Sequence, residues 1–449
     1  MSFWTSDRIT EATNGKLIGK AFTTGAVNTD TRTIGKGEFF IALAGENFDG
    51  HQYLTKAAER GAVAALVSYI PDEVPQELAL VKVSNTLEAL QEMARYRRAH
   101  TETKILAITG SVGKTSAKEM LKLALSEYGE TYATSGNYNN HIGLPITLCN
   151  MPETNDYAIL EMGMNHAGEI SFLSKIAKPE VALITNVEAV HLEFFDSVEA
   201  IAHAKAEIFE GMAKGVAVLP IDNVYYQILK SAAAHCEVLN FGESVQSTLR
   251  LVSADVEYEY ANQLRSFKLA THGAHWPKAA LGVLACVAAL GLPLKKAEHA
   301  LSCYQEQKGR GAVVELPWSG GKITLMDDAY NASPVSMAAA LATLATLGQG
   351  RKLAILGEML ELGETSAQLH ASMAEPIAQN RIDAVVTVGA GMQPLTDILP
   401  SHVHLAHFAN AEDASARIET LVKAGDAVLC KGSHGSGVHR FVGVLKQQQ

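Results

Sequence analysis

Short apolar runs alternate with segments of helical period along most of the chain, which is the pattern of an α/β protein. The alternation falls into three blocks. The first block extends to about residue 100 and predicts strands at 38–44 and 62–67 and helices at 53–60 and 86–98. The polar stretch 100–104 lacks this periodicity and predicts a linker to the second block.

The second block opens with a strand at 105–109 and contains two more, at 157–161 and 181–185, with helices between them. Alternating strands and helices favour parallel sheets, whose ligands bind beyond the carboxyl ends of the strands. The third block begins after Gly309 and repeats the pattern, with strands predicted at 323–326, 353–356, 384–388 and 427–430.

A length of 449 residues agrees with three domains, at roughly 150 residues each. We place them at 1–100, 101–312 and 313–449. The longest apolar run, 279–294, is interrupted by glycine and proline and falls short of the ~20 residues that span a bilayer. It therefore predicts a buried helix.

The charge balance excludes some classes of function. The chain carries 37 basic and 48 acidic residues, and this net charge of −11 argues against a nucleic-acid-binding surface. Its five cysteines lie far apart without a C-x-x-C pair, so neither a zinc site nor a disulfide framework is predicted. The first residues lack the basic and apolar pattern of a signal peptide. We expect a cytoplasmic protein without a membrane span.

The segment GSVGKTS, residues 110–116, follows an apolar strand and precedes a helical pattern, as a phosphate-binding loop does. Backbone amides at the helix start would hold phosphate oxygens, Lys114 would neutralise phosphate charge, and the Thr115 hydroxyl would ligate Mg²⁺. The usual pattern G-x-x-x-x-G-K-[ST] has a glycine where this chain has Ile108. A chance glycine turn before a helix is the alternative.

Three more side chains of this block are candidates for metal chemistry. Glu161 ends a predicted strand and places a carboxylate where Mg²⁺ on Thr115 would lie, and His191 follows the next strand at the same edge. Lys205 shares the apolar face of a helical segment, so desolvation should favour its neutral amine. A neutral amine can add CO₂, and the carbamate can replace a carboxylate as a metal ligand.

Each of these candidates has a structural alternative. Glu161 could be a satisfied acid at a strand end, and His191 a structural histidine. Lys205 could extend to solvent or pair with Glu161.

Arg310 lies where the second block meets the third, and the strand that follows ends in Asp327 and Asp328, before Tyr330 and Asn331. A polar loop that faces the phosphate loop across a domain joint suits ribose and γ-phosphate contacts. A solvated turn is the alternative.

Nearly the whole chain resembles the Mur ligases, the cytoplasmic amino-acid-adding enzymes of peptidoglycan synthesis, because seven of their motifs occur in order. These are TGSVGKT, GNYNNHIGLP, LEMGMN, TNVEAVHLEFF, AKAEIF, GRGAVVEL and DDAYNASP. The strings ENFDGHQY, ILGEMLELG and VLCKGSHGSGVH resemble the branch that joins D-alanyl-D-alanine to UDP-N-acetylmuramoyl-tripeptide. The neighbouring branch, which adds diaminopimelate or lysine, usually carries D-N-P-R, and that string does not occur here.

The resemblance implies an ATP- and Mg²⁺-dependent ligase of cell wall biogenesis, and so of cell shape and division, which we expect to be a monomer. It implies an N-terminal UDP-substrate domain, a central P-loop-type domain with a mostly parallel sheet, and a Rossmann-like C-terminal domain that binds D-alanyl-D-alanine. The family's phosphate loop is the shorter T-G-x-x-G-K-[ST], so Ile108 is compatible with nucleotide binding.

The resemblance also assigns individual residues. The ATP phosphates would be bound by Gly110, Ser111, Val112, Gly113, Lys114 and Thr115, and the nucleotide contacted across the joint by Arg310, Asp327 and Asn331. Thr115 and Glu161 would hold one Mg²⁺, and His191 and a carbamylated Lys205 a second. Catalysis would depend on Lys114, His191, Lys205 and Arg310. The muramoyl side would be lined by Asn137, Asn140 and His141, and the UDP group by Thr31, Arg32, Phe48 and Asp49.

Four positions depart from the family pattern: Ala279 in the adenine-side motif, Ser333 in N-A-N-P, Glu358 where Asp is common, and His434 where K-G-S-R has Arg. Two other functions remain open. One is another amide ligase of the superfamily, such as a folylpolyglutamate synthase. The other is a protein that uses ATP binding to move a partner.

Overall fold

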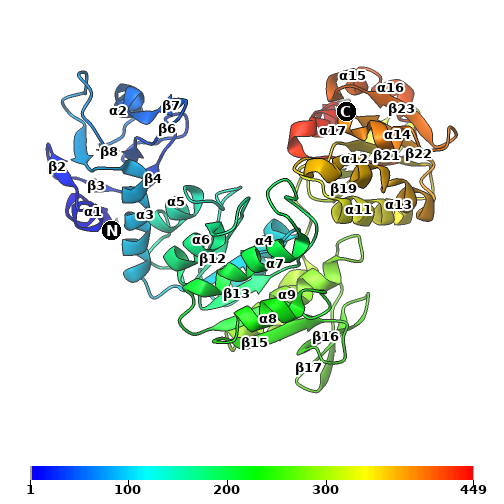
Figure 1. The fold of residues 1–449 in the computed structure, drawn as a ribbon, viewed down its shortest axis with the longest axis horizontal. Helices are drawn as coiled ribbons and strands as arrows, with labels where there is room; N and C mark the ends of the chain where they lie inside the picture. The colour runs from blue at the N-terminus through cyan, green and yellow to red at the C-terminus, as the bar shows by residue number, and fades with distance from the viewer. Residues whose placement is uncertain (1–2, 448–449) are drawn as a thin grey trace.

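The alternation of strands and helices builds three large sheets, each in a lobe of its own; two further sheets, of β1 with β3 and of β6 with β7, have two strands each in the described residues. The computed structural model describes residues 3–447. The N-terminal and C-terminal lobes lie at opposite ends of the molecule with the middle lobe between them (Figure 1). The predicted α/β class is confirmed.

The N-terminal lobe contains a five-stranded sheet in the order β2-β9-β8-β5-β4, in which only the edge strand β2 is antiparallel. The predicted strand at 38–44 is shorter than expected, because the chain turns after Ile41 into a small hairpin of β6 and β7. The strands are β1 (Trp4–Thr5), β2 (Lys16–Ile18), β3 (Thr23–Thr24), β4 (Val27–Asn28), β5 (Phe39–Ile41), β6 (Ala44–Gly45), β7 (Phe48–Asp49), β8 (Ala64–Val67) and β9 (Ala79–Lys82). The helices are α1 (Ser6–Thr13), η1 (Gly50–Tyr53), α2 (Leu54–Glu59) and α3 (Thr86–Ala99).

The middle lobe contains a nine-stranded sheet in the order β11-β12-β10-β13-β14-β15-β16-β17-β18, parallel from β11 to β16. The three predicted strands are its β10 (Lys104–Thr109), β12 (Tyr157–Glu161) and β13 (Val181–Ile184). Six strands were not predicted. They are β11 (Thr131–Ala133), β14 (Val216–Pro220), β15 (Glu237–Gly242), β16 (Leu249–Ser253), β17 (Glu257–Tyr260) and β18 (Gln263–Ser266).

Seven α-helices belong to the described middle lobe, together with the short η2 (Glu207–Gly211). The apolar run at 279–294 forms most of the buried α9, as predicted. No helix within residues 3–447 combines the length and the apolar character that a membrane crossing requires. The seven are α4 (Lys114–Leu125), α5 (Gly143–Cys149), α6 (Glu169–Ala177), α7 (Val198–Ala206), α8 (Tyr226–Ala232), α9 (Trp276–Ala289) and α10 (Leu294–Ser302).

The C-terminal lobe contains a six-stranded sheet in the order β19-β20-β24-β21-β22-β23, in which only the β19–β20 hairpin is antiparallel. Its strands are β19 (Ala312–Trp318), β20 (Gly321–Asp328), β21 (Lys352–Gly357), β22 (Ala384–Val388), β23 (His404–Phe408) and β24 (Ala427–Lys431). Its helices are α11 (Pro334–Thr346), η3 (Gly363–Thr365), α12 (Ser366–Ala371), α13 (Ala374–Gln379), η4 (Ala390–Met392), α14 (Gln393–Thr396), α15 (Ala411–Ser415), α16 (Ile418–Leu421), η5 (His434–Ser436) and α17 (Val438–Gln447).

The N-terminal and middle lobes share one hydrophobic core. A single cluster of buried apolar side chains extends from Trp4 and Leu90 in the first lobe to Leu144 and Ile170 in the second. Polar contacts reinforce this joint. Trp4 Nε1 donates to the Cys149 carbonyl at 2.8 Å, and Asn150 exchanges two hydrogen bonds with the Val27 backbone. These two lobes therefore form one mechanical unit.

The C-terminal lobe has its own cores, one on each face of its sheet, and neither cluster includes a residue of the other lobes. Its position relative to the middle lobe therefore depends on the connecting chain and on a few polar contacts. This difference between the two joints makes the C-terminal lobe the part that can move as a unit.

The buried guanidinium of Arg97 contributes to the joint between the N-terminal and middle lobes. It donates to the carbonyls of Met151 and Pro152, each at 3.0 Å, from a side chain that is 1% exposed. Arg97→Ala removes the donor from both carbonyls, so the free energy of unfolding should fall by about 2–4 kcal/mol. Urea unfolding followed by tryptophan fluorescence measures the change.

Arg95→Ala is the matched control on the same helix, because Arg95 is only partly buried: it pairs with Glu92 and lies over the Phe172 ring, 5.6 Å from its centre. Its effect should stay below about 1 kcal/mol. Equal unfolding midpoints for the two variants would contradict the structural role of Arg97.

Candidate active site

The loop from Gly110 to Gly113 joins β10 to α4 in a conformation that requires glycine. Gly110 and Gly113 have φ values of +151° and +82°, and a Cβ on Gly110 would lie 1.9 Å from Thr185 Oγ1. No side chain of the described residues caps the start of α4. The amides of its first turn are therefore free to bind an anion, and the helix dipole favours negative charge there.

The loop is fastened to the end of the neighbouring strand β13. Ser111 Oγ donates to the Glu188 carbonyl at 3.0 Å, and the Glu188 amide donates to Ser111 Oγ at 2.8 Å. The Val112 amide donates to Asn186 Oδ1, and Thr185 Oγ1 donates to the Val112 carbonyl. These contacts hold the loop amides in fixed directions. Burial raises the pKa of Glu188, which also lines the site.

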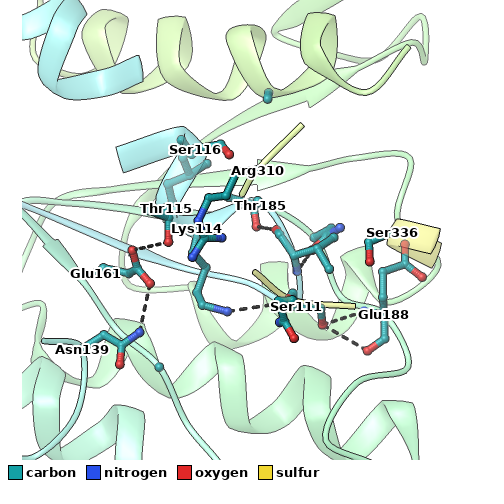
Figure 2. A pocket seen from close by; sticks show the side chains of 18 of the residues that line it. Ser111, Lys114, Thr115, Ser116, Asn139, Glu161, Thr185, Glu188, Arg310 and Ser336 are labelled. Carbon is teal, nitrogen blue, oxygen red and sulfur yellow. Dashed lines mark hydrogen bonds between the residues drawn. The ribbon is translucent and has the colours of Figure 1, made fainter. Parts of the chain in front are cut away.

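Thr115 and Glu161 meet at the carboxyl end of the sheet. Thr115 Oγ1 donates to Glu161 Oε2 at 2.9 Å, and Asn139 Nδ2 donates to the other carboxylate oxygen at 2.9 Å (Figure 2). Glu161 is 2% exposed. The pair offers only oxygen donors, which is the ligand chemistry that Mg²⁺ prefers.

Lys118 lies beneath this pair and was not singled out from the sequence. Its ammonium donates to the Thr134 carbonyl at 2.7 Å and lies 3.1 Å from Glu119 and 3.9 Å from Glu161. The side chain is 1% exposed. The Lys118 side chain is therefore a buried neighbour of the Glu161 carboxylate.

A cavity of about 1040 Å³ opens in front of the phosphate loop and is lined by all three lobes, including Gln91 of α3. This volume lies at the upper end of the ~300–1,000 Å³ typical of ligand sites. A second cavity of about 480 Å³ adjoins it and shares Ser111, Lys114 and His191. Together they offer room for a nucleotide and a second substrate.

Lys114 and Arg310 bring positive charge to the cavity from two sides. Lys114 Nζ donates to the Gly110 carbonyl at 2.8 Å, and desolvation lowers its pKa. Arg310 lies over the ring of Tyr330, 4.2 Å from its centre. Both side chains line the cavity, as the sequence predicted for a phosphate site (Figure 2).

The structure separates two adjacent aspartates at the end of β20. Asp328 lines the cavity and accepts a hydrogen bond from Lys431 at 2.7 Å, whereas Asp327 faces the other side and pairs with Lys446. Burial raises the pKa of Asp328. The structure thus does not bring the predicted nucleotide ligand Asp327 to the site, but it does bring Asn331, which lines both cavities.

Lys205 is buried in α7 with a side chain that is 2% exposed. Within residues 3–447 no hydrogen bond or ion pair reaches its amine, so neither the solvent-exposed alternative nor pairing with Glu161 is found. Desolvation, reinforced by repulsion from Lys114, lowers the pKa of Lys205 well below its usual value. The amine is therefore neutral at lower pH than an ordinary lysine.

His191 lines both cavities, and its Nδ1 lies 2.6 Å from Glu361 Oε2 of the C-terminal lobe. The imidazole is the largest factor that lowers the pKa of Glu361. Glu361 was not singled out from the sequence. Within residues 3–447 no cluster of three or more His, Cys, Asp or Glu side chains forms a ready metal site.

The predicted muramoyl residues Asn137, Asn140 and His141 line the wall of the large cavity. Asn140 Oδ1 accepts hydrogen bonds from the Ile142 and Gly143 amides at the start of α5. The His141 carbonyl accepts a hydrogen bond from Gln91 of α3. The N-terminal lobe therefore reaches the cavity beside these three residues.

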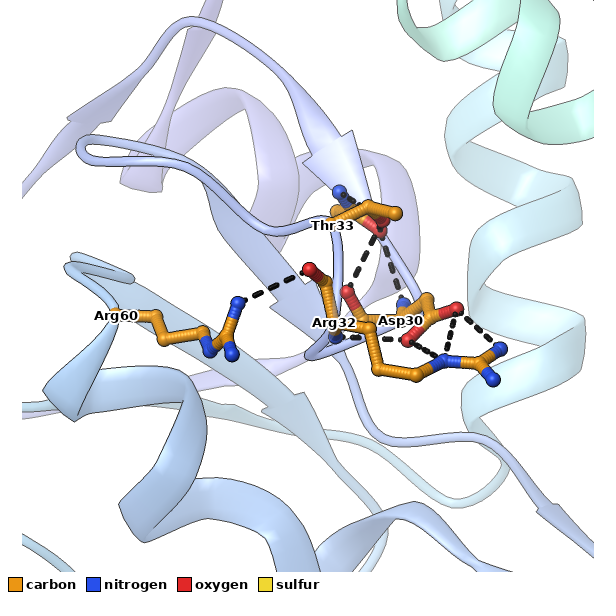
Figure 3. Close-up of polar contacts among 5 residues, drawn as sticks. Asp30, Arg32, Thr33 and Arg60 are labelled. Atoms are coloured by element: carbon orange, nitrogen blue, oxygen red, sulfur yellow. Dashed lines mark hydrogen bonds and ion pairs between the residues drawn. The ribbon is translucent and has the colours of Figure 1, made fainter.

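The four predicted UDP contacts lie in the N-terminal lobe and do not line this cavity. Arg32 is exposed and forms a bidentate pair with Asp30, while Arg60 donates to the Arg32 carbonyl (Figure 3). Thr31, which precedes Arg32, is buried. Phe48 is half exposed and stacks on Tyr53. Asp49 accepts hydrogen bonds from the His51 amide and the Tyr69 hydroxyl.

Three models of known families match the chain. They are the Mur ligase family catalytic domain at residues 24–98, the Mur ligase middle domain at 108–287, and the Mur ligase glutamate ligase domain at 309–434. The UDP-N-acetylmuramoyl-tripeptide–D-alanyl-D-alanine ligase of Rickettsia prowazekii is 36% identical over 98% of this chain and 99% of its own length. The chain belongs to the Mur ligase family.

Solved structures agree with this membership. MurF from Acinetobacter baumannii superimposes with a TM-score of 0.88 at 29% identity and covers 99% of both chains. MurF from Thermotoga maritima, solved in complex with ADP, gives a TM-score of 0.80 at 26% identity, over 95% of this chain and 98% of that one. The family predicted from the order of motifs is thus confirmed.

Two alternative enzymes share the fold with much lower identity. A diaminopimelate-adding ligase has a TM-score of 0.51 at 15% identity over 95% of each chain. A bifunctional folylpolyglutamate synthase has a TM-score of 0.60 at 17% identity over 80% of this chain and 94% of that one. At these identities the similarity concerns the fold alone.

The four departures from the family pattern have visible roles. Ser333 caps α11 in a reciprocal capping box with Ser336. Glu358 accepts a hydrogen bond from the Gly391 amide at 2.6 Å, and His434 stacks on His439 at the edge of the smaller cavity. Ala279 lines the large cavity, as does His275.

Lys114→Ala should abolish turnover and leave the fold intact. The side chain is the phosphate loop's only cation, and losing one such contact costs about 10²–10³-fold in rate. Phosphate release gives the rate, and circular dichroism reports the fold. Lys122→Ala, an exposed lysine on the same helix, is the control and should retain full activity. An active Lys114→Ala enzyme would rule out the phosphate-loop assignment.

Proposed function

We propose that the chain is an ATP-dependent ligase that joins D-alanyl-D-alanine to UDP-N-acetylmuramoyl-tripeptide and releases ADP and phosphate. The product is the pentapeptide precursor of peptidoglycan. One observation carries the proposal: full-length similarity to ligases of this name coincides with one cavity that unites the phosphate loop, Glu161 and Arg310.

The residues of the cavity fit both ATP and Mg²⁺. The uncapped start of α4 and the cation Lys114 suit a triphosphate, and the hydroxyl–carboxylate pair of Thr115 and Glu161 suits a hard metal ion. Bound Mg²⁺ would neutralise phosphate charge at this pair. Arg310 approaches from the connection to the C-terminal lobe and adds a second cation.

Amide formation needs an activated carboxylate, because an oxide ion cannot leave at neutral pH. The terminal carboxylate oxygen of the tripeptide attacks the γ-phosphorus and displaces ADP, which gives an acyl phosphate. The neutral amine of D-alanyl-D-alanine then attacks the acyl carbon, the tetrahedral intermediate expels phosphate, and the amine proton goes to solvent or base. Lys114 and Arg310 face the charge that develops in both steps.

The arrangement of the three lobes suits this order of chemical steps. The N-terminal lobe is fixed to the middle lobe and would hold the UDP group through the loop and hairpin that carry Thr31, Arg32, Phe48 and Asp49. Asn137, Asn140 and His141 would guide the muramoyl peptide towards the phosphate loop. The C-terminal lobe would bring the dipeptide and exclude water from the acyl phosphate.

We assign His191 and a carbamylated Lys205 to a second Mg²⁺ site. Burial and the lowered pKa of Lys205 support the carbamate, because only a neutral amine adds CO₂. The carbamate would convert a buried cation into an anion with two oxygen donors. A monomer in the cytoplasm, where ATP and nucleotide-linked precursors are made, completes the proposal.

Phosphate release with each substrate omitted in turn tests the function. Release should require ATP, UDP-N-acetylmuramoyl-tripeptide and D-alanyl-D-alanine together, with tripeptides that contain either diaminopimelate or lysine tried as acceptors. Free diaminopimelate should not replace the dipeptide. The opposite preference would move the chain to the neighbouring branch, and release without any amine would favour an ATP-driven switch.

Lys205→Ala should be almost inactive and should recover partly with added short carboxylates, which can occupy the place of the carbamate. With ¹³C-labelled bicarbonate, the wild type should show a carbamate resonance that is absent from the variant. The resonance should grow as the pH rises at constant dissolved CO₂, because a larger fraction of the amine is then neutral. An active enzyme that lacks the resonance would contradict the carbamate.

A further inference from the structure

Glu361 and His191 form the only side-chain ion pair between the middle and C-terminal lobes within residues 3–447. Beside it, the Glu193 amide donates to the Glu361 carbonyl at 3.3 Å. Neither hydrophobic core crosses this joint. The approach of Glu361 to His191 is therefore the most specific contact by which the mobile lobe recognises the catalytic lobe.

The backbone has an unusual conformation on both sides of this contact. His191 and Glu361 adopt left-handed conformations, with φ values of +57° and +62°, which side chains other than glycine rarely take. Gly363 also has a positive φ, and a Cβ there would lie 3.1 Å from Glu193 Cα. Strain on both sides of one contact indicates that surrounding structure holds these residues in place for a function.

The segment before Glu361 is anchored inside the C-terminal lobe. The Met359 amide donates to the buried His370 Nε2 at 2.9 Å, and the Leu360 amide donates to Ser433 Oγ at 3.0 Å. The Ser433 amide in turn donates to the Glu358 carbonyl. Glu361 is thus carried by a rigid support, so the position of its carboxylate reports the position of the whole lobe.

The contact also fixes the chemistry of the imidazole. A carboxylate only accepts, so Nδ1 of a neutral His191 must carry the proton, and Nε2 keeps its lone pair. Within residues 3–447 no hydrogen bond occupies Nε2. Histidines that ligate metals commonly donate their other ring N–H to a carboxylate, which fixes the tautomer and the ring orientation.

We propose that Glu361 is a positioning residue, which docks on His191 across the lobe joint and presents Nε2 of that ring to the second metal ion. Docking of the C-terminal lobe and completion of the second metal site are then one event. The acyl phosphate would form with full charge compensation only when the lobe that carries the amine is in place. This inference depends on the proposed role of His191 as a metal ligand.

Metal binding tests the inference without turnover. Mn²⁺ is titrated into the full chain with a non-hydrolysable ATP analogue, and free Mn²⁺ is followed by electron paramagnetic resonance. Wild type should bind two ions. Glu361→Ala should bind the first normally and the second about 10–100-fold more weakly, whereas Glu361→Gln, whose amide oxygen can still accept from Nδ1, should lose less.

Glu364→Gln is the matched control, because Glu364 is exposed in the same loop, and it should behave as wild type. Kinetics separate positioning from simple attachment of the lobe. Glu361→Ala should lower kcat with an unchanged KM for the UDP-tripeptide, and excess Mg²⁺ should restore kcat. If excess Mg²⁺ does not restore kcat and Glu361→Ala binds both metal ions with normal affinity, Glu361 serves only to hold the two lobes together. That result would overturn the proposal.

A wild type that binds a single Mn²⁺ would also overturn it, because His191 would then hold no second ion. The ligase assay on the same preparation keeps this result apart from the proposed function. Ligation with D-alanyl-D-alanine by a protein that binds one ion would refute the role of Glu361 and leave the function standing.

Discussion

The attachment of the phosphate loop to the end of β13 is the constraint on which the rest of the site depends. Amides bind phosphate only when their directions are fixed, and here Ser111, Val112 and Gly110 are all held against residues 185–188. The same edge of the sheet supplies Glu161 from β12 and His191 beyond β13. Loop, carboxylate and imidazole therefore share one rigid reference, which is the parallel sheet itself.

The fixed position of the phosphate loop on the sheet explains why the middle lobe is joined differently to the N-terminal and C-terminal lobes. The tripeptide carboxylate must lie in line with the γ-phosphate, so the lobe assigned to its UDP group shares a hydrophobic core with the phosphate loop. The amine attacks only after the acyl phosphate has formed, and the product must then leave. The third lobe has separate cores and meets the middle lobe through polar contacts, which would allow it to open and close.

The sequence predicted the elements whose pattern is local. The buried strands that lead to the site were found with their ends close to the observed ones, because parallel strands buried on both faces are continuous apolar runs. The strands β16 to β18 at one end of the sheet were missed, because they are only four or five residues long and rich in polar and charged side chains. The sequence showed both Asp327 and Asp328 at a strand end, and the nucleotide contact of Asp327 came from the family resemblance; the local pattern did not show that Asp328 is the one that lines the cavity. Glu361 was missed because its partner is 170 residues away.

Three almost fully buried lysines differ in the partners of their amines, and the sequence alone does not show this difference. Lys118 neighbours two carboxylates and donates to a carbonyl, and Lys431 has both a carboxylate and a carbonyl, so each charge is compensated. Lys205 has no such partner within the described chain and lies near enough to Lys114 to be repelled by it. An uncompensated buried cation is unstable, and becoming neutral or gaining a negative group relieves it. Of the three, Lys205 is therefore the one whose environment favours loss of the positive charge, which is the condition that the proposed carbamate requires.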